Sequence, residues 1–239
     1  YYLLPLIASY GALPIDYRTT PPTIHFTDPP TENAIRQVFD LGKNGYLHYD
    51  RLVGQPDGLY STHAAIYPVS SSDNPYSDKN PNARFVPYPK GGLGTPVAFD
   101  VGAGYISAKT AYPEACYRWL STLAQHPELF LAMPARHSLL DSPFVQAQGP
   151  AAALYKTMDA LLQAPDTLIL PPPGTYLDIF LPRWLYRAAD HYILGDADLD
   201  TELHNAEALT QAFEACMNPG MDTPAPSVND CIKKVDPSM

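Results

Sequence analysis

The stretch from Pro96 to Met133 constrains the fold most, because a strand, a polar turn and an amphipathic helix follow one another in it. Alternating apolar residues and two glycines indicate a strand over 97–106 that a ligand or another backbone approaches closely. Residues 107–110 turn the chain, and Pro113 suits a first helical turn, where its missing N–H would be unpaired anyway. The next apolar residues recur at helical spacing and predict one apolar helix face, made of Cys116, Trp119, Leu120 and Leu123.

Periodicity and end signals predict the remaining elements. The end of a helix is expected before Gly11, and a short helix is expected to begin at Pro127. Longer helices are expected over 28–45, from 143 onward, and over 151–162, 182–193 and 199–216, and strand-like segments over 23–26, 64–67, 85–89 and 167–170. The tail beyond Cys216 is expected to be loop-like.

The order of several segments resembles the family 1 extracellular solute-binding proteins, the capture subunits of ABC importers that mostly take up sugars. A glycine-bearing strand ends in Ile106-Ser107, and the helical segment PEACYRWLSTLAQHPELF follows it. A Pro-Ala-Arg-x-Ser segment comes next, at residues 134–138. Upstream, Lys43-Asn44-Gly45 is similar to the exit of a family helix, and residues 64–67 are similar to a family strand. The order of these pieces is more specific than any one of them.

The resemblance implies an α/β fold of the two-lobed, periplasmic-binding-protein type II kind, of which this chain holds the later part only. Residues 1–95 would then form helices and strands of lobe two, and residues 96–215 the glycine-bearing strand and the closing helices. Residues 216–239 would form a disulfide-closed tail. The chain starts at Tyr1 without an initiating Met or the features of an intact signal peptide, so we expect it to be the C-terminal portion of a longer protein.

The resemblance also implies a function. Such a protein captures a small polar ligand, here a sugar or oligosaccharide, by hinge closure, and delivers it to the ABC permease subunits in the membrane. We therefore expect an extracellular or periplasmic monomer, anchored as a lipoprotein through a segment before Tyr1. No catalytic residue, cofactor or metal is expected.

The ligand-binding candidates lie around the 97–106 strand and on aromatic residues elsewhere. Asp100 is expected either to accept hydrogen bonds from ligand hydroxyls or to be a structural acid at the strand end. An aromatic face covers the apolar face of a pyranose, although core packing is the alternative for each ring. The family loop after residues 64–67 often carries a stacking Trp; residues 68–82 contain none, so Tyr67 or Tyr76 would substitute. The expected ligand-binding set is Tyr67, Asp100, Gly102, Tyr105, Tyr176 and Trp184.

Composition excludes other classes of function. The formal net charge is −10 and the 15 basic residues are scattered, which argues against a nucleic-acid partner. No apolar run reaches the ~20 residues that a membrane-spanning helix needs. Acidic residues between 196 and 207 mimic the spacing of a calcium loop. Thr201 occupies the position where that loop requires Gly, so a helix N-terminus explains these acids better.

The three cysteines divide into a pair and a single residue. Cys216 and Cys231 are close in sequence across a loop that contains Pro and Gly, which predicts a disulfide worth roughly 3 kcal/mol. A disulfide fits an oxidising compartment. Cys116 lies on the apolar face of its helix and is expected to be a free, buried thiol.

Two other classes of function stay open at this point. An enzyme that acts on glycans would need two carboxylates facing each other across the bond, and Asp100 has no evident partner in the sequence. A non-catalytic surface or adhesion domain would need no ligand site at all.

Overall fold

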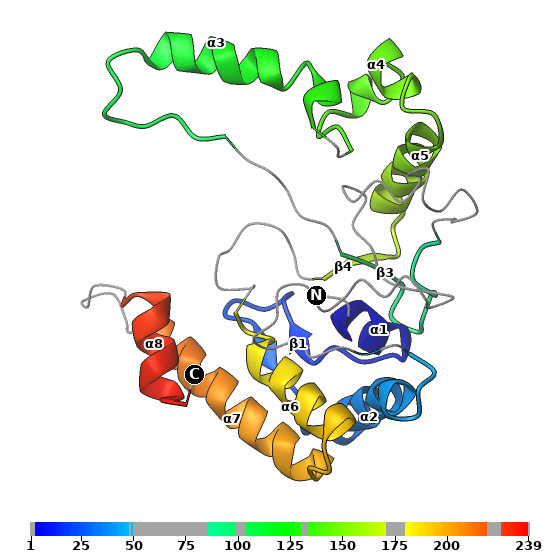
Figure 1. Cartoon of the computed structure of the whole chain (residues 1–239), viewed down its shortest axis with the longest axis vertical. Coiled ribbons are helices and arrows are strands. Elements are labelled where there is room, and N and C mark those ends of the chain that lie inside the picture. The colour runs from blue at the N-terminus through cyan, green and yellow to red at the C-terminus, as the bar shows by residue number, and fades with distance from the viewer. Residues whose placement is uncertain are drawn as a thin grey trace. The chain divides into compact units, whose positions relative to one another are not determined.

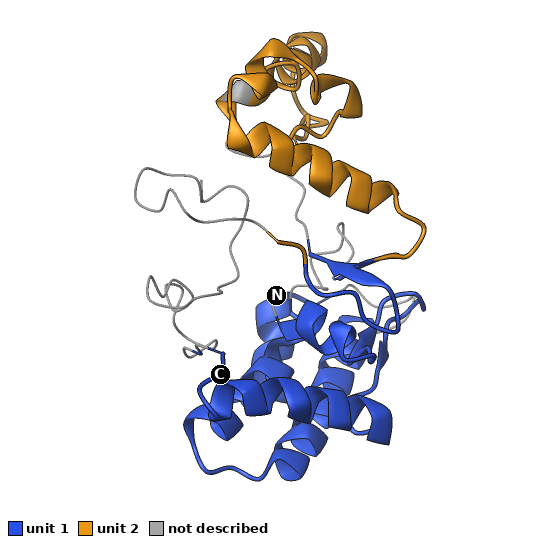
Figure 2. Cartoon of the chain, turned by 90° about the vertical axis from the view of Figure 1, so that its right-hand side faces the viewer, with its two compact units in different colours: residues 1–67, 88–99, 168–239 blue, residues 68–87, 100–167 orange. Residues whose placement is uncertain are grey.

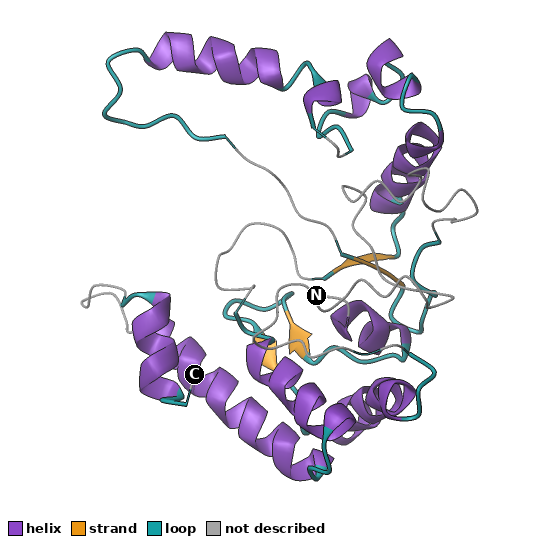
Figure 3. Cartoon of the chain, in the orientation of Figure 1, coloured by secondary structure: helices purple, strands orange, loops and turns teal. Residues whose placement is uncertain are grey.

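A computed structural model of the chain describes residues 3–47, 49, 86–98, 104–130, 133–170, 180–218 and 226–238. The fold is mixed α/β and rich in helix, with two small two-stranded sheets (Figures 1 and 3). The predicted general class is therefore confirmed, and the two-lobed binding-protein fold stays a prediction. None of the helices among these residues combines the length and the apolar character needed to cross a bilayer.

The chain divides into two compact units (Figure 2). Unit 1 contains residues 1–67, 88–99 and 168–239, and unit 2 contains residues 68–87 and 100–167. Unit 1 is thus built from three separate parts of the sequence. Its core therefore contains residues from both the N-terminal and the C-terminal parts of the chain.

The core of unit 1 lies between three amphipathic helices, α2 (Pro29–Lys43), α6 (Arg183–Leu194) and α7 (Leu199–Met217). The predicted starts of α2 and α7 are confirmed. Asp28 precedes two prolines at the start of α2, and the Asp198 carboxylate accepts a hydrogen bond from the Thr201 N–H at the start of α7. The acidic residues near position 198 therefore belong to the N-terminus of a helix. The fully buried side chains at the centre include Ile35, Val38, Phe39, Trp184, Leu185, Leu203 and Phe213.

The N-terminal part of unit 1 packs on this bundle. It contains α1 (Leu3–Ser9) and the antiparallel pair β1 (Ile15–Asp16) and β2 (Thr23–Ile24), in which Ile15 pairs with Ile24. One carboxylate oxygen of Glu207 in α7 accepts hydrogen bonds from the backbone N–H groups of Phe26 and Thr27, at 2.7 and 2.9 Å. This carboxylate joins the entry of α2 to a helix 180 residues further along the chain.

The second small sheet pairs β3 (Thr95–Val97) with β4 (Thr167–Ile169). The loop before β3 reverses between Gly91 and Gly94, which pair through their backbones. Gly91 lies against the end of α1, where an added Cβ would come within 2.4 Å of the Ser9 carbonyl oxygen. The strand predicted over 85–89 is wrong for its described residues 86–89, because they form no strand.

Unit 2 contains α3 (Pro113–Leu123), short 3₁₀ turns at Pro127–Leu129 (η2) and His137–Leu139 (η3), α4 (Pro143–Gln146) and α5 (Pro150–Gln163). Ser142 caps α4 as its sequence predicts, by accepting a hydrogen bond from the Val145 N–H. The core of this unit is small. It consists of Leu140, Val145, Ala152 and Tyr155, with Met133 and Ala151 partly buried against them.

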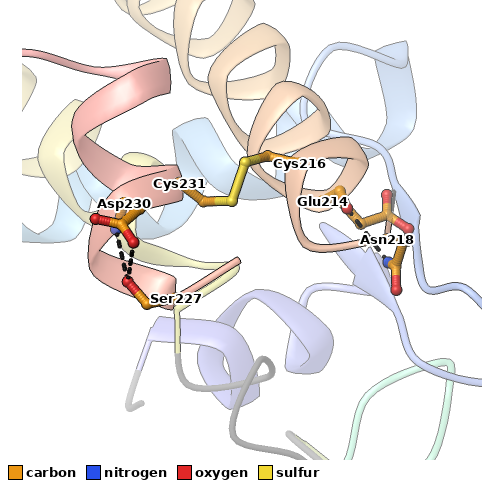
Figure 4. The surroundings of a disulfide bond; sticks show 6 residues. All are labelled: Glu214, Cys216, Asn218, Ser227, Asp230 and Cys231. Carbon is orange, nitrogen blue, oxygen red and sulfur yellow. Dashed lines mark hydrogen bonds between the residues drawn. A yellow bond between two sulfur atoms is a disulfide. The ribbon is translucent and has the colours of Figure 1, made fainter. Parts of the chain in front are cut away.

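The tail ends in a helix, so the expected loop-like tail is wrong. Helix α8 (Val228–Val235) begins at Ser227, whose hydroxyl oxygen accepts a hydrogen bond from the Asp230 N–H (Figure 4). Cys231 in α8 and Cys216 near the end of α7 form the predicted disulfide, with their Cα atoms 5.8 Å apart. Cys116 is free as predicted, but it is only partly buried.

A buried carboxylate fixes the other end of α8. Asp236, directly after the helix, accepts hydrogen bonds from the indole N–H of Trp184 at 3.0 Å and from Arg187, both in α6. Ser238 donates to the other carboxylate oxygen of Asp236. Burial raises the pKa of Asp236, but these hydrogen bonds and the charge of Arg187 outweigh burial and lower the pKa to about 2.

The contact between Gly91 and Ser9 predicts a difference between two neighbouring glycines. We expect Gly91→Ala to lower the free energy of unfolding by about 1–3 kcal/mol, because the new methyl group meets a backbone oxygen that cannot rotate away. Gly92→Ala is the matched control, since an added Cβ there has no atom within 4 Å. Urea unfolding of both variants measures the difference. Equal stabilities would contradict the contact.

The lowered pKa of Asp236 predicts a dependence of stability on pH. A lowered pKa stabilises the folded state above the unfolded-state pKa of about 3.8, and that contribution disappears as the pH falls towards 2. The difference corresponds to about 2 kcal/mol. We expect the stability gap between wild type and Asp236→Asn to narrow by this amount between pH 5 and pH 2 in urea unfolding. A gap that is constant with pH would show that Asp236 has an ordinary pKa.

Candidate ligand-binding surface

The structure describes two of the six predicted ligand-binding residues. Tyr105 belongs to unit 2 and Trp184 to unit 1. The other four, Tyr67, Asp100, Gly102 and Tyr176, lie outside the described residues. Tyr76, named as an alternative to Tyr67, also lies outside them.

Trp184 is a core residue, and the prediction that it contacts ligand is wrong. Its side chain has no exposed surface, and its ring centroid lies 5.3 Å from that of Phe213 in α7. Its indole N–H donates to Asp236, so its one polar group is satisfied inside the protein. Asp236, directly after α8, packs against the first turn of α6 at this position.

Tyr105 is the predicted candidate that the structure leaves accessible, with 90% of its surface exposed. It follows Gly104, where an added Cβ would come within 2.6 Å of a terminal methyl group of Leu120 in α3. The glycine therefore brings the segment 104–106 close to the side of α3. The strand predicted over 97–106 is wrong for its described residues 98 and 104–106, because they form no strand. The group that approaches Gly104 is a side chain of the same unit and not the predicted ligand or backbone.

A short hydrogen-bonded turn leads from Tyr105 into α3. The Thr110 N–H donates to the Ser107 carbonyl oxygen at 3.1 Å, and the Lys109 N–H donates to the Ser107 hydroxyl at 3.2 Å. The Thr110 hydroxyl accepts a hydrogen bond from the Tyr112 N–H, directly before Pro113 begins the helix. These local bonds explain why a polar Ser-Ala-Lys-Thr sequence forms a compact turn here.

The apolar face predicted for α3 exists, but it is not part of a core. None of the eleven residues of α3 is buried among the residues that the structure describes. Tyr112, Tyr117 and Trp119 expose between 61% and 74% of their surfaces, whereas Leu120 and Leu123 are partly covered. The sequence pattern gave the correct face of the helix and the wrong surroundings for it.

Four exposed aromatic side chains are thus carried by fifteen consecutive residues of unit 2. We call Tyr105, Tyr112, Tyr117 and Trp119 the aromatic surface because all four are exposed. Tyr117 and Trp119 are two residues apart in α3 and therefore point to different sides of the helix. Polar groups of the same segment accompany it, including an exposed ion pair in which the guanidinium of Arg118 donates to Glu114 at 3.1 Å. Aromatic faces with hydrogen-bonding groups at their edges are chemically suited to a ligand that has both C–H and hydroxyl groups. Of these residues, sequence reasoning chose Tyr105 alone; the local density of Tyr and Trp was the signal for the rest.

Other polar clusters in the described residues have structural partners. In unit 2, His137 pairs with Asp159 at 2.9 Å, and Lys156 pairs with Asp141 at 2.7 Å. In unit 1 the phenol of Tyr49 donates a hydrogen bond to the buried Asp190 at 2.9 Å. Burial of the phenol raises the pKa of Tyr49, and the neighbouring Asp190 carboxylate raises it further. No group of three or more His, Cys, Asp or Glu side chains within the described ranges has the proximity that a metal site needs.

Unit 2 also has a shallow hollow of about 170 Å³ between α5 and residues 86–87. Apolar side chains line most of it, and Thr157 supplies the one hydroxyl group. A site that binds a polar ligand needs several converging hydrogen-bonding groups, so the aromatic surface fits such a ligand better.

Comparison with known proteins gives this chain no relative: no family model, no curated protein and no solved structure matches it. The candidate surface therefore depends on its own geometry and on the residue pattern of the segment that carries it.

The opposite environments of the two tryptophans predict opposite effects of their removal. Trp184→Ala should lower the free energy of unfolding by about 3–5 kcal/mol, because it leaves a cavity beside Phe213 and removes a donor from Asp236. Trp119→Ala is the control and should change stability by about 0.5 kcal/mol or less, since its ring is mostly exposed. Urea unfolding measures both. A small effect of Trp184→Ala on the free energy of unfolding would contradict the burial of this side chain.

Proposed function

We propose that this chain belongs to an extracellular solute-binding protein of an ABC importer and captures a sugar or an oligosaccharide. The observation that supports this most is the aromatic surface, because it lies in the same stretch that carries the family resemblance. That stretch runs from the glycine-bearing segment 97–106 through α3 to the Pro-Ala-Arg-x-Ser segment at 134–138. The chemistry of the surface and the order of the sequence segments favour the same class of ligand.

The mechanism follows from the chemistry of a pyranose ring. Its C–H groups form apolar patches that would stack on the face of Trp119 or of one of the tyrosines, while its hydroxyl groups would bind to polar groups of the same segment. Arg118 and Glu114 are the charged residues of α3 closest in sequence to these rings. Closure of two lobes around the ligand would then exclude water from the stacked rings and strengthen the polar contacts.

The proposal includes a location and a partner. The Cys216–Cys231 disulfide favours an oxidising compartment, as expected outside the cytoplasm. A capture protein there delivers its ligand to permease subunits in the membrane, and a lipid anchor would keep it nearby. The net charge of −10 is compatible with a neutral ligand and unfavourable for an anionic one.

The two tryptophans allow a direct test by fluorescence. Trp119 is 63% exposed and Trp184 is buried, so acrylamide should quench Trp119 selectively. Titration with a panel of maltose, cellobiose, xylobiose and chitobiose, and with their longer oligomers, should protect Trp119 from quenching for the sugar that binds. Trp119→Ala should weaken that binding by about 1–3 kcal/mol in calorimetry, or about 5- to 150-fold.

The control is Tyr46→Ala, which removes a similarly exposed aromatic residue from unit 1 and should leave affinity unchanged. A sugar that binds wild type and Trp119→Ala equally would contradict the proposed surface. Protection by none of the sugars would contradict the proposed ligand class. Hydrolysis of chromogenic glycosides by the wild-type protein would instead assign a glycan-active enzyme.

A further inference from the structure

Helix α8 is attached to unit 1 in two chemically different ways. Cys231, in the middle of the helix, is covalently bound to Cys216 of α7 (Figure 4). Asp236, at its C-terminal end, is bound to Trp184 and Arg187 of α6 by hydrogen bonds and charge. Because the two attachments lead to different helices, the loss of one leaves the other in place.

The attachment at Asp236 is buried and fully partnered. The side chain of Asp236 is 8% exposed and that of Arg187 21% exposed, so little water competes for their contact. The Asp236 N–H also donates to the Ile232 carbonyl oxygen at 2.8 Å, which joins the carboxylate rigidly to the last turn of α8. Ile232 and Cys231 are themselves buried against the same core. Apolar burial and a buried ion pair therefore hold α8 in addition to the sulfur–sulfur bond.

We propose that Asp236 holds α8 in place when the disulfide is open, so that Cys216 and Cys231 form a reversible redox pair that opens and closes without release of the helix. The two thiols of the reduced protein then stay near each other. The pair is a thiol-sensitive element of the fold, and Asp236 is its positioning residue.

The reducing chemistry requires a small thiol, such as glutathione. Residue Cys216 is partly exposed and residue Cys231 is fully buried, so in the proposed reaction the glutathione thiolate attacks the sulfur of Cys216. The bond between the two cysteine sulfurs breaks, and Cys231 leaves as a thiolate that takes up a proton. A second glutathione thiolate then attacks the mixed disulfide, which gives oxidised glutathione and the protonated Cys216 thiol. Two electrons and two protons pass to the protein, and two glutathione molecules are oxidised to one disulfide.

The position of α8 decides how strongly the pair favours the disulfide. Ring closure between two tethered groups is governed by their effective concentration, which falls when one of them is free to move away. With Asp236 in contact with α6, Cys231 stays opposite Cys216 and the effective concentration is high. Without that contact, the reduced protein gains undocked states of α8, and the equilibrium shifts towards the dithiol.

The test measures this equilibrium in glutathione buffers at pH 7, with Cys116→Ser as the common background so that two thiols remain. Alkylation and intact-mass analysis give the fraction of disulfide at each ratio of reduced to oxidised glutathione. We expect Asp236→Asn to lower the effective concentration at least tenfold. Asp230→Asn is the matched control, because Asp230 also belongs to α8 but contacts only the cap residue Ser227 in the described contacts, and it should change the value less than twofold.

A second measurement keeps the inference testable if Asp236→Asn folds poorly. Trp184 donates to Asp236, so its fluorescence reports whether the end of α8 is docked. In the Cys116→Ser, Trp119→Phe background, where Trp184 is the only tryptophan left, replacing Cys216 and Cys231 by Ser should leave the Trp184 emission maximum and its low acrylamide quenching unchanged. Equal effective concentrations for Asp236→Asn and Asp230→Asn, or a red-shifted and quenchable Trp184 in the double serine variant, would overturn the proposal.

Discussion

The contact that the rest of unit 1 depends on is the meeting of Trp184, Phe213 and Asp236, which joins α6, α7 and α8. The indole ring fills the space between the helices, and its N–H needs a buried acceptor. Asp236 supplies that acceptor, and Arg187 compensates its charge. Helices α1 and α2 then cover the remaining apolar surface, so the bundle closes around one aromatic residue whose polar group is satisfied from the tail of the chain.

Local signals in the sequence predicted most helices well. Pro29 and Pro30 marked the start of α2, and the acidic residues around Asp198 marked the start of α7, because both signals act on the first turn of a helix. The disulfide was also predictable, since its cysteines are only 15 residues apart. Helix α8 was missed although its sequence carries helix signals: Ser227 precedes it with Asp230 three residues later, and Val228, Cys231, Ile232 and Val235 recur at helical spacing. The three prolines between residues 219 and 226 favoured a loop instead. The hydrogen bonds between Asp236 and α6 are long-range contacts, which no local pattern predicts.

The aromatic surface also shows which property a sequence pattern does not predict. The pattern of α3 correctly identified an apolar face, but a pattern does not reveal what covers that face. Trp119 was placed on the apolar face of its helix and is exposed, whereas Trp184 was named as a ligand contact, with core packing as the alternative, and is buried. The two predictions failed for one reason: the burial of a large ring depends on which distant element reaches it. Tyr105, for which ligand contact and core packing were the two expectations, is exposed in the structure, so core packing is ruled out for it.

The distribution of unit 1 over three parts of the sequence has a consequence for biosynthesis. Phe26 and Glu207 make their hydrogen bond across 181 residues, and α6 and α7 follow the whole of unit 2 in the chain. During translation, the apolar faces of α1 and α2 therefore leave the ribosome long before their partners exist. At typical elongation rates of about 5–20 residues per second, this interval is on the order of ten seconds or more. The order of the elements in the chain therefore sets how long these apolar faces wait for α6 and α7 during synthesis.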